Sequence, residues 1–211
     1  MNIVHYGHAC VLLETESARL LFDPGPFSSG FEELTGLDAV LITHQHFDHL
    51  DMSRLSQLLP ANPEARLFAD PGGARALAEH DLHPTVLRPA DSVSIAGTSV
   101  TGVGGDHAVI HPDIPVIPNV GYLVDHGAFY HPGDAFFVPA QEIDVLALPT
   151  GGPWLKLWEA VDFLREIGPR VAVPVHEAIL VSPEFHYRVF EDLAPAESAV
   201  KVLDRGKPAE V

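Results

Sequence analysis

The sequence of 211 residues is poor in cysteine and has no long hydrophobic run. Its single cysteine, Cys10, cannot form an internal disulfide, and a buried reduced thiol is the ordinary role for such a residue. Apolar runs such as "VLITH" and "VLALP" are far shorter than the roughly 20 residues that a bilayer-spanning helix needs. We therefore expect a protein that does not cross a membrane.

Basic residues are also scarce. The 12 lysines and arginines face 29 aspartates and glutamates, so the formal net charge is −17. Nucleic-acid affinity rests largely on basic side chains that neutralise phosphates, so DNA and RNA are not expected partners. The first residues, "MNIVHYGHACVLLE", lack the basic region and cleavage site of a signal peptide. We expect a cytoplasmic protein with a small-molecule substrate, and the sequence leaves a homo-oligomer open.

Short strand-like runs alternate with turn residues along the whole chain. The predicted strands lie within residues 2–6, 10–14, 19–25, 38–43, 65–70, 85–89, 92–97, 99–104, 121–125, 127–134, 144–149 and 170–176. The clearest helix pattern opens at Pro153, places Trp154 and Trp158 on its apolar face, and ends at Gly168. Weaker helix patterns cover 51–59, 71–80 and 183–193. Together they predict one α/β domain over residues 1–211, with two mixed sheets and helices outside.

The segment "THQHFDHLD", residues 43–51, concentrates nitrogen and oxygen donors directly after an apolar strand. His44 and His46 are two apart, so an extended backbone sends both side chains to the same side. Asp48 and His49 follow at the next turn and can serve a neighbouring ion. Imidazole and carboxylate ligands suit zinc, and also iron or manganese. Asp51 is expected to cap the following helix rather than to bind metal.

Three later donors stand at the ends of predicted strands, where loops converge on sites. They are His107 in "GVGGDHA", Asp134 in "FYHPGD" and His176 in "VAVPVH". His111 is an alternative to His107, and His131 lies three residues before Asp134. We favour His107 because it directly follows its strand.

The order "HQHFDH", His107, Gly133-Asp134 and "PVH" resembles the metallo-β-lactamase superfamily from residue 3 to about residue 181. "HYGHACVLLE" and "LLFDPG" resemble the subgroup of ascorbate-6-phosphate lactonase-like hydrolases and phospholipase D-type phosphodiesterases. The resemblance implies a four-layer αββα sandwich. It also implies a binuclear metal-dependent hydrolase, whose metal-bridging hydroxide attacks a small ester, lactone or phosphodiester.

The resemblance further implies two divalent ions, most suitably Zn²⁺, with Mn²⁺ or Fe²⁺ as alternatives. Its ligand pattern gives His44, His46 and His107 to one ion, and Asp48, His49 and His176 to the other, with Asp134 as the bridge. Asp48 and Asp134 are the expected catalytic residues, and Asp48 would orient the bridging water or receive its proton.

Supporting roles follow for four further residues. The resemblance places Asp23 of "LLFDPG" beneath the metals, where it organises the loop, and His8 of "GHAC" beside them, against the ligands or the substrate. His131 near the bridge remains a further candidate for the site. Lys156 either meets a phosphate or carboxylate of the substrate or is a solvated helix lysine.

Two other functions are weighed against hydrolysis. Diiron redox proteins of this superfamily usually have Glu where this chain has His46, which favours hydrolysis. A non-catalytic relative would be expected to have lost some of the seven donors, and all seven are present here. Colour and metal content after purification without added metal would discriminate the iron protein.

Overall fold

The computed structural model describes every residue from Met1 to Val211, and its strands form two seven-stranded sheets. The first sheet has the order β14-β1-β2-β3-β4-β5-β6 and the second β13-β12-β11-β10-β9-β8-β7. The first consists of β1 (Asn2–Gly7), β2 (Cys10–Glu14), β3 (Arg19–Phe22), β4 (Ala39–Ile42), β5 (Arg66–Ala69), β6 (Thr85–Val86) and β14 (Pro208–Glu210). The second consists of β7 (Ser92–Ile95), β8 (Thr98–Asp106), β9 (Pro118–Val124), β10 (Phe129–His131), β11 (Val145–Pro149), β12 (Val171–Val175) and β13 (Ala199–Val200). The helices are α1 (Met52–Leu58), α2 (Pro71–Ala78), the 3-10 helix η1 (Asp125–Gly127), α3 (Leu157–Ile167) and α4 (Pro183–Leu193).

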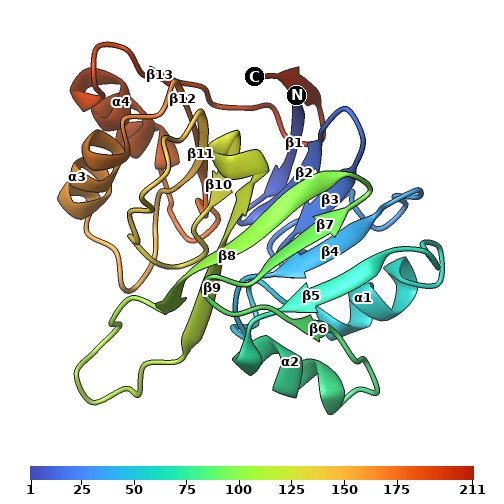
Figure 1. Ribbon diagram of the computed structural model, residues 1–211. Coiled ribbons are helices and arrows are strands. Elements are labelled where there is room, and N and C mark those ends of the chain that lie inside the picture. The colour runs from blue at the N-terminus through green and yellow to red at the C-terminus, as the bar shows by residue number, and fades with distance from the viewer.

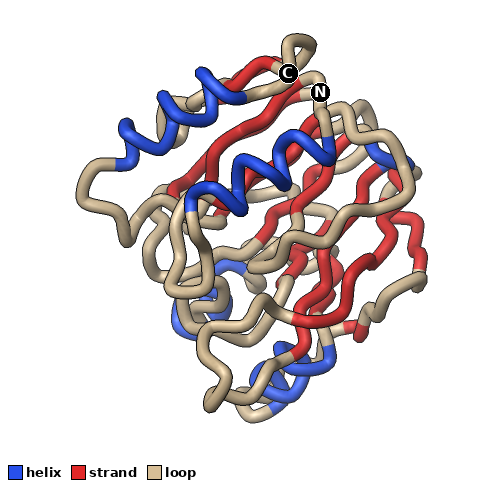
Figure 2. Tube along the Cα trace, turned by 90° about the vertical axis from the view of Figure 1, so that its left-hand side faces the viewer, coloured by secondary structure: helices blue, strands red, loops and turns tan.

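Helices cover the outer faces of both sheets, which confirms the four-layer αββα prediction (Figures 1 and 2). Alternation along β4 shows why: Leu41 joins the core cluster between the sheets, whereas Ile42 joins the cluster that includes Leu55 of α1 and Leu77 of α2. On the other side, Leu164 of α3 packs in a third cluster against the second sheet. None of the helices combines the length and the apolar content that a membrane span requires.

Parallel strands direct the important loops to one edge of the molecule. Strands β3, β4 and β5 are parallel in the first sheet, and β10, β11 and β12 are parallel in the second. Crevices beyond the carboxyl ends of such strands are where open α/β sheets bind ligands. All four residues of β4 are buried, so the strand is a rigid support for the donor-rich segment that follows it.

Asp51 accepts hydrogen bonds from the backbone of Ser53 and Arg54, which confirms its predicted role as the N-cap of α1.

Two details differ from the sequence prediction. Helix α3 begins at Leu157, so Trp154 lies in the preceding turn, and Trp158 is 60 % exposed instead of packing in the core. The late start follows from Glu159, whose carboxylate accepts the backbone N–H of Lys156 and so caps the helix there. The short strands β13 and β14 were not predicted. Strand β14 pairs with β1, which brings the two chain ends together (Figure 1).

Candidate metal centre

The donor-rich loop after β4 is anchored from below by Asp23, which follows β3 and is completely buried. Thr43 donates its backbone N–H to Asp23 Oδ1 over 2.8 Å and its hydroxyl to Oδ2 over 2.7 Å. His49 Nδ1 donates to the same Oδ2 over 2.7 Å. Asp23 therefore holds both ends of the loop.

One group of donors gathers His44, His46, His107 and Asp134, whose ligand atoms all lie within 4.8 Å of one another. His44 Nε2 lies 3.0 Å from His46 Nδ1, because the two residues project to the same side of the loop. His107 directly follows β8, and its Nε2 lies 3.4 Å from Asp134 Oδ2. Four groups at such spacing can surround a single ion.

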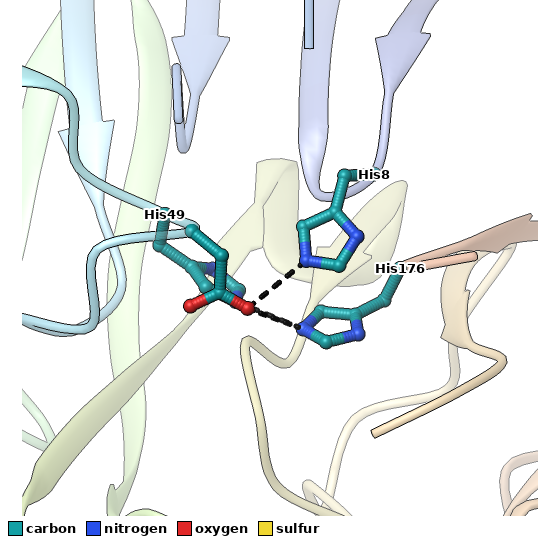
Figure 3. A group of neighbouring side chains, drawn as sticks. His8, His49 and His176 are labelled. Atoms are coloured by element: carbon teal, nitrogen blue, oxygen red, sulfur yellow. Dashed lines mark hydrogen bonds and ion pairs between the residues drawn. The ribbon is translucent and has the colours of Figure 1, made fainter. Parts of the chain in front are cut away.

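A second group gathers His8, Asp48, His49 and His176, again within 4.8 Å. His176 stands at the end of β12 and His8 in the turn between β1 and β2, and their rings lie side by side (Figure 3). His176 Nε2 is 3.1 Å from His49 Nε2 and 3.6 Å from Asp48 Oδ2. The loops of both sheets thus contribute to one centre.

Asp134 lies between the two groups. Its Oδ1 is 3.1 Å from His49 Nε2 and 3.2 Å from His176 Nε2, while its Oδ2 faces His107. Burial by itself would raise the pKa of Asp134, but His176 and His49 outweigh it and hold that pKa well below its ordinary value. The carboxylate is therefore ionised and offers one oxygen to each side.

Four of the histidines share one hydrogen-bonding arrangement, in which Nδ1 donates to an oxygen and Nε2 points toward the other donors, where it can bind a metal ion once any proton on it is released. The acceptors are Thr43 Oγ1 for His44, Asp23 Oδ2 for His49, Ala108 O for His107 and Gly151 O for His176. In addition, His107 Nε2 and Asp134 Oδ1 are buried without any hydrogen-bond partner. Buried polar atoms are rarely left unpaired, and this set of nitrogens and carboxylate oxygens fits divalent metal ions.

His8 departs from this arrangement. Its Nδ1 accepts the backbone N–H of Ala178 over 3.4 Å, which places the ring proton on Nε2, and Nε2 donates to Asp48 Oδ2 over 3.1 Å. Burial lowers the pKa of His8 to about 4, so the ring is neutral and has only this one proton. In this tautomer Nε2 has no lone pair for a metal, and His8 instead supports Asp48.

The other predicted candidates lie outside both groups. His131 donates Nε2–H to Ala9 O over 3.0 Å and accepts the Gly133 N–H at Nδ1, so both of its nitrogens are engaged. The His111 side chain is 60 % exposed. The Lys156 ammonium is also exposed and pairs with Glu159 over 3.0 Å.

Sequence reasoning missed two polar contacts of the centre. Trp154, expected to be part of the core, donates its indole N–H to Asp134 Oδ2 over 2.7 Å. Glu177 accepts the backbone N–H of His8 and a hydrogen bond from Arg205, which ties the β1–β2 turn to the end of β12. The only signal for either was position, since Trp154 follows a Gly-Gly-Pro turn and Glu177 directly follows a predicted ligand.

A cavity of about 380 Å³ opens above the donor groups. His46, Asp48, His107 and Asp134 form its polar part. The remaining lining is apolar and consists of Phe27, Phe47, Ile110, Pro153, Trp154 and Ile179. A small molecule in this cavity would therefore touch the donors directly.

Comparison with known proteins identifies relatives with the same fold and a family to which the sequence belongs. A family model described as beta-lactamase superfamily domain matches residues 2–176. The chain is 50 % identical to protein Rv0786c of Mycobacterium tuberculosis, over 95 % of this chain and 99 % of that one. It is 26 % identical to a UPF0173 metal-dependent hydrolase of Aeropyrum pernix, over 99 % and 97 % of the two chains. The structure of Igni18, a metallo hydrolase from Ignicoccus hospitalis, superposes with a TM-score of 0.77 at 20 % identity, covering 99 % of this chain and 97 % of that one. The strand-end donors, the αββα layers and the match over residues 2–176 lead to one conclusion: this chain belongs to the β-lactamase superfamily.

Proposed function

We propose that the protein is a metal-dependent hydrolase that uses two divalent ions, most suitably Zn²⁺, to cleave a small ester, lactone or phosphodiester. The observation that carries the proposal is the position of Asp134, with Oδ1 beside His49 and His176 and Oδ2 beside His107. A carboxylate placed in this way can be shared by two ions. The relative in Aeropyrum pernix is named as a metal-dependent hydrolase, which supports the same reaction class.

The ligands divide between the two ions as the two donor groups do. His44, His46 and His107 would hold one ion, Asp48, His49 and His176 the other, and Asp134 both. Mn²⁺ and Fe²⁺ accept the same ligand types and remain alternatives to zinc. When bound, such a pair of ions supplies a water of lowered pKa as nucleophile and a Lewis acid for the scissile group.

The protein itself positions the reacting groups and moves the proton. Asp48 and Asp134 both line the cavity, but the side chain of Asp48 is 16 % exposed and that of Asp134 only 4 %, so an attacking water reaches Asp48 more readily. Asp48 Oδ2 accepts the hydrogen bond from His8 Nε2 and lies 3.6 Å from His176 Nε2, so it is the oxygen that would face the ion, and Oδ1 is left to orient that water or accept its proton. Asp23 and Thr43 fix the histidine rings of the loop through the hydrogen bonds described above.

The size of the cavity and the charge of the chain favour a small molecule over a polymer. A volume of about 380 Å³ is within the usual range for a small-ligand site. The formal net charge of −17 would repel a polyanion such as DNA or RNA.

The proposal is tested by hydrolysis assays on the protein loaded with Zn²⁺ or Mn²⁺. The panel contains bis-p-nitrophenyl phosphate, p-nitrophenyl esters, and sugar and alkyl lactones. We expect the wild type to cleave at least one class, and Asp134→Ala to fall to the background rate. Asp113→Ala serves as the matched control, because the Asp113 side chain is 92 % exposed and belongs to neither donor group, and it should retain full activity. Equal inactivity of wild type and Asp134→Ala on every substrate would contradict the proposal.

A further inference from the structure

The cavity above the donor groups has a distinct chemical character. All of its polar lining comes from the proposed ligands, and every other lining residue is apolar. Several of these side chains are also open to solvent, since Phe47 is 66 % exposed, Ile179 45 % and Phe27 37 %. Large apolar side chains that gather at the mouth of a polar centre mark a binding surface more often than isolated exposed residues do.

These apolar residues come from separate parts of the chain. Phe27 follows β3, Phe47 lies in the donor-rich loop, Ile110 follows β8, and Ile179 follows β12. Phe27 and Phe47 pack edge to face, with their ring centroids 5.4 Å apart, and form one wall. Four loops that place apolar groups around one opening create an environment suited to an alkyl or aryl group.

No lysine or arginine lines this cavity. Lys156 lines an adjoining cavity, where its ammonium pairs with Glu159 over 3.0 Å. Arg205 is engaged by Glu177. A substrate with an anionic group away from its scissile bond would therefore find no protein cation to pair with, and it would approach a chain of net charge −17.

A smaller pocket of about 70 Å³ adjoins the cavity. It shares His46, His107 and Ile110 with the cavity and extends along Ile114 and Val116, which are 48 % and 50 % exposed. A substituent longer than the main cavity could extend along this loop.

We infer that the substrate is an uncharged carboxylic ester or lactone bearing an apolar alkyl or aryl group, which binds against Phe27, Phe47 and Ile179. This rests on the proposed hydrolase function and narrows its substrate class. Hydrolysis forms a bond between the water oxygen and the carbonyl carbon and breaks the acyl C–O bond. The products are a carboxylate and an alcohol, with one proton released to solvent, so no oxidant or reductant is needed.

The first test uses p-nitrophenyl esters and the metal-loaded wild type. We expect kcat/KM to rise at least tenfold from the acetate to the octanoate, because each added methylene leaves water for the apolar wall. The monoester of glutaric acid should react at least tenfold more slowly than the pentanoate, which has the same chain length without the terminal carboxylate. Equal rates for acetate and octanoate, or for glutarate and pentanoate, would overturn the inference while leaving the hydrolase function in place.

The second test moves a positive charge into the wall. Ile179→Lys should lower kcat/KM for the octanoate at least fivefold and raise it for the glutarate monoester. Val181→Lys is the matched control, because Val181 is fully exposed two residues away and does not line the cavity, and it should change both values less than twofold. Unfolding temperature and metal content of both variants identify any loss of folding. If Ile179→Lys and Val181→Lys behave alike, the inference is wrong.

Binding without turnover separates the two proposals. Trp154 lines the cavity, so its fluorescence should respond to γ-decalactone at a concentration at least tenfold lower than to γ-butyrolactone. Tight binding of γ-decalactone by a protein that cleaves no ester, lactone or phosphodiester would support the apolar site and overturn the hydrolase function. A fluorescence response equal for both lactones would overturn the apolar site.

Discussion

Trp154 donates its indole N–H to Asp134 Oδ2 over 2.7 Å, and so directly supports the carboxylate that lies between the two donor groups. The indole is 7 % exposed and packs against Phe136, with ring centroids 5.0 Å apart. It therefore fixes the direction in which Asp134 presents its oxygens. Partners of this kind orient ligands in metal sites and raise their affinity for the ion.

Replacing Trp154 by Phe keeps an aromatic ring but removes the donor. We expect metal affinity or kcat/KM to fall about tenfold or more, because hydrogen-bond partners of ligands typically contribute that much. Competition with a chelator and steady-state kinetics measure the two quantities. Trp158→Phe is the control, since Trp158 is 60 % exposed, belongs to neither donor group and does not line the cavity. If both variants keep wild-type affinity and activity, the Trp154 hydrogen bond has no role in the centre.

His8→Ala should lower activity without removing an ion. The reason is the tautomer: His8 Nδ1 accepts the Ala178 N–H, so its Nε2 donates to Asp48 instead of binding metal. His176→Ala, on the neighbouring ring 3.8 Å away between centroids, should lose an ion. Elemental analysis of both dialysed variants gives the answer. A metal content of His8→Ala as low as that of His176→Ala would show that His8 is a ligand.

Gly25→Ala should disrupt the donor-rich loop. A Cβ at Gly25 would overlap the backbone carbonyl of Asp48, which cannot move without displacing His49. We expect the free energy of unfolding to fall by about 2 kcal/mol or more, as at other overpacked sites, and metal binding to become weaker. Urea denaturation and elemental analysis measure these effects.

Gly206→Ala provides the comparison for Gly25→Ala. No atom lies within 4 Å of a Cβ at Gly206, so only its positive φ of 71° is strained. That strain costs about 1 kcal/mol and should leave metal binding unchanged. Equal metal loss in the two variants would contradict a specific role for the contact between Gly25 and Asp48.

Asp70 is the buried N-cap residue of α2, and its carboxyl group should make the free energy of unfolding depend on pH. Burial raises the pKa of Asp70 to about 6 from its ordinary 3.8, although the backbone N–H groups of Gly73 and Gly72 oppose the shift. Between these values the folded protein holds a proton that the unfolded chain has released, so the stabilisation from this group is lost as pH rises from about 4 to about 6. The free energy of unfolding of the wild type relative to Asp70→Asn should therefore fall by about 3 kcal/mol over this window. Urea denaturation at pH 4 and pH 7 tests this, and a difference independent of pH would contradict it.

The sequence points to the candidate ligands because their signals are local. His44, His46, Asp48 and His49 lie within six residues, and their spacing alone limits what they can do together. His107, Asp134 and His176 each follow an apolar strand, and the ends of such strands converge in a layered fold. The layers themselves follow from apolar alternation, as β4 shows by sending Leu41 and Ile42 to opposite faces.

The contacts that support the ligands could not be predicted, because they depend on distant residues. Trp154 fits the helical apolar pattern, and only the actual start of α3 at Leu157 frees its indole to reach Asp134. Glu177 and Arg205 are 28 residues apart and meet only because β14 pairs with β1. Strands as short as β13, with two residues, show no recognisable alternation.

If Asp134 joins two metal ions, removing its carboxylate must change the number of ions that the protein binds. Wild type and Asp134→Ala are purified without added metal, loaded with excess Zn²⁺, dialysed, and analysed by inductively coupled plasma mass spectrometry. Circular dichroism establishes that both are folded. We expect two tightly bound ions per chain in the wild type and at most one in Asp134→Ala. Two tightly bound ions retained by Asp134→Ala, or none bound by the wild type, would contradict it.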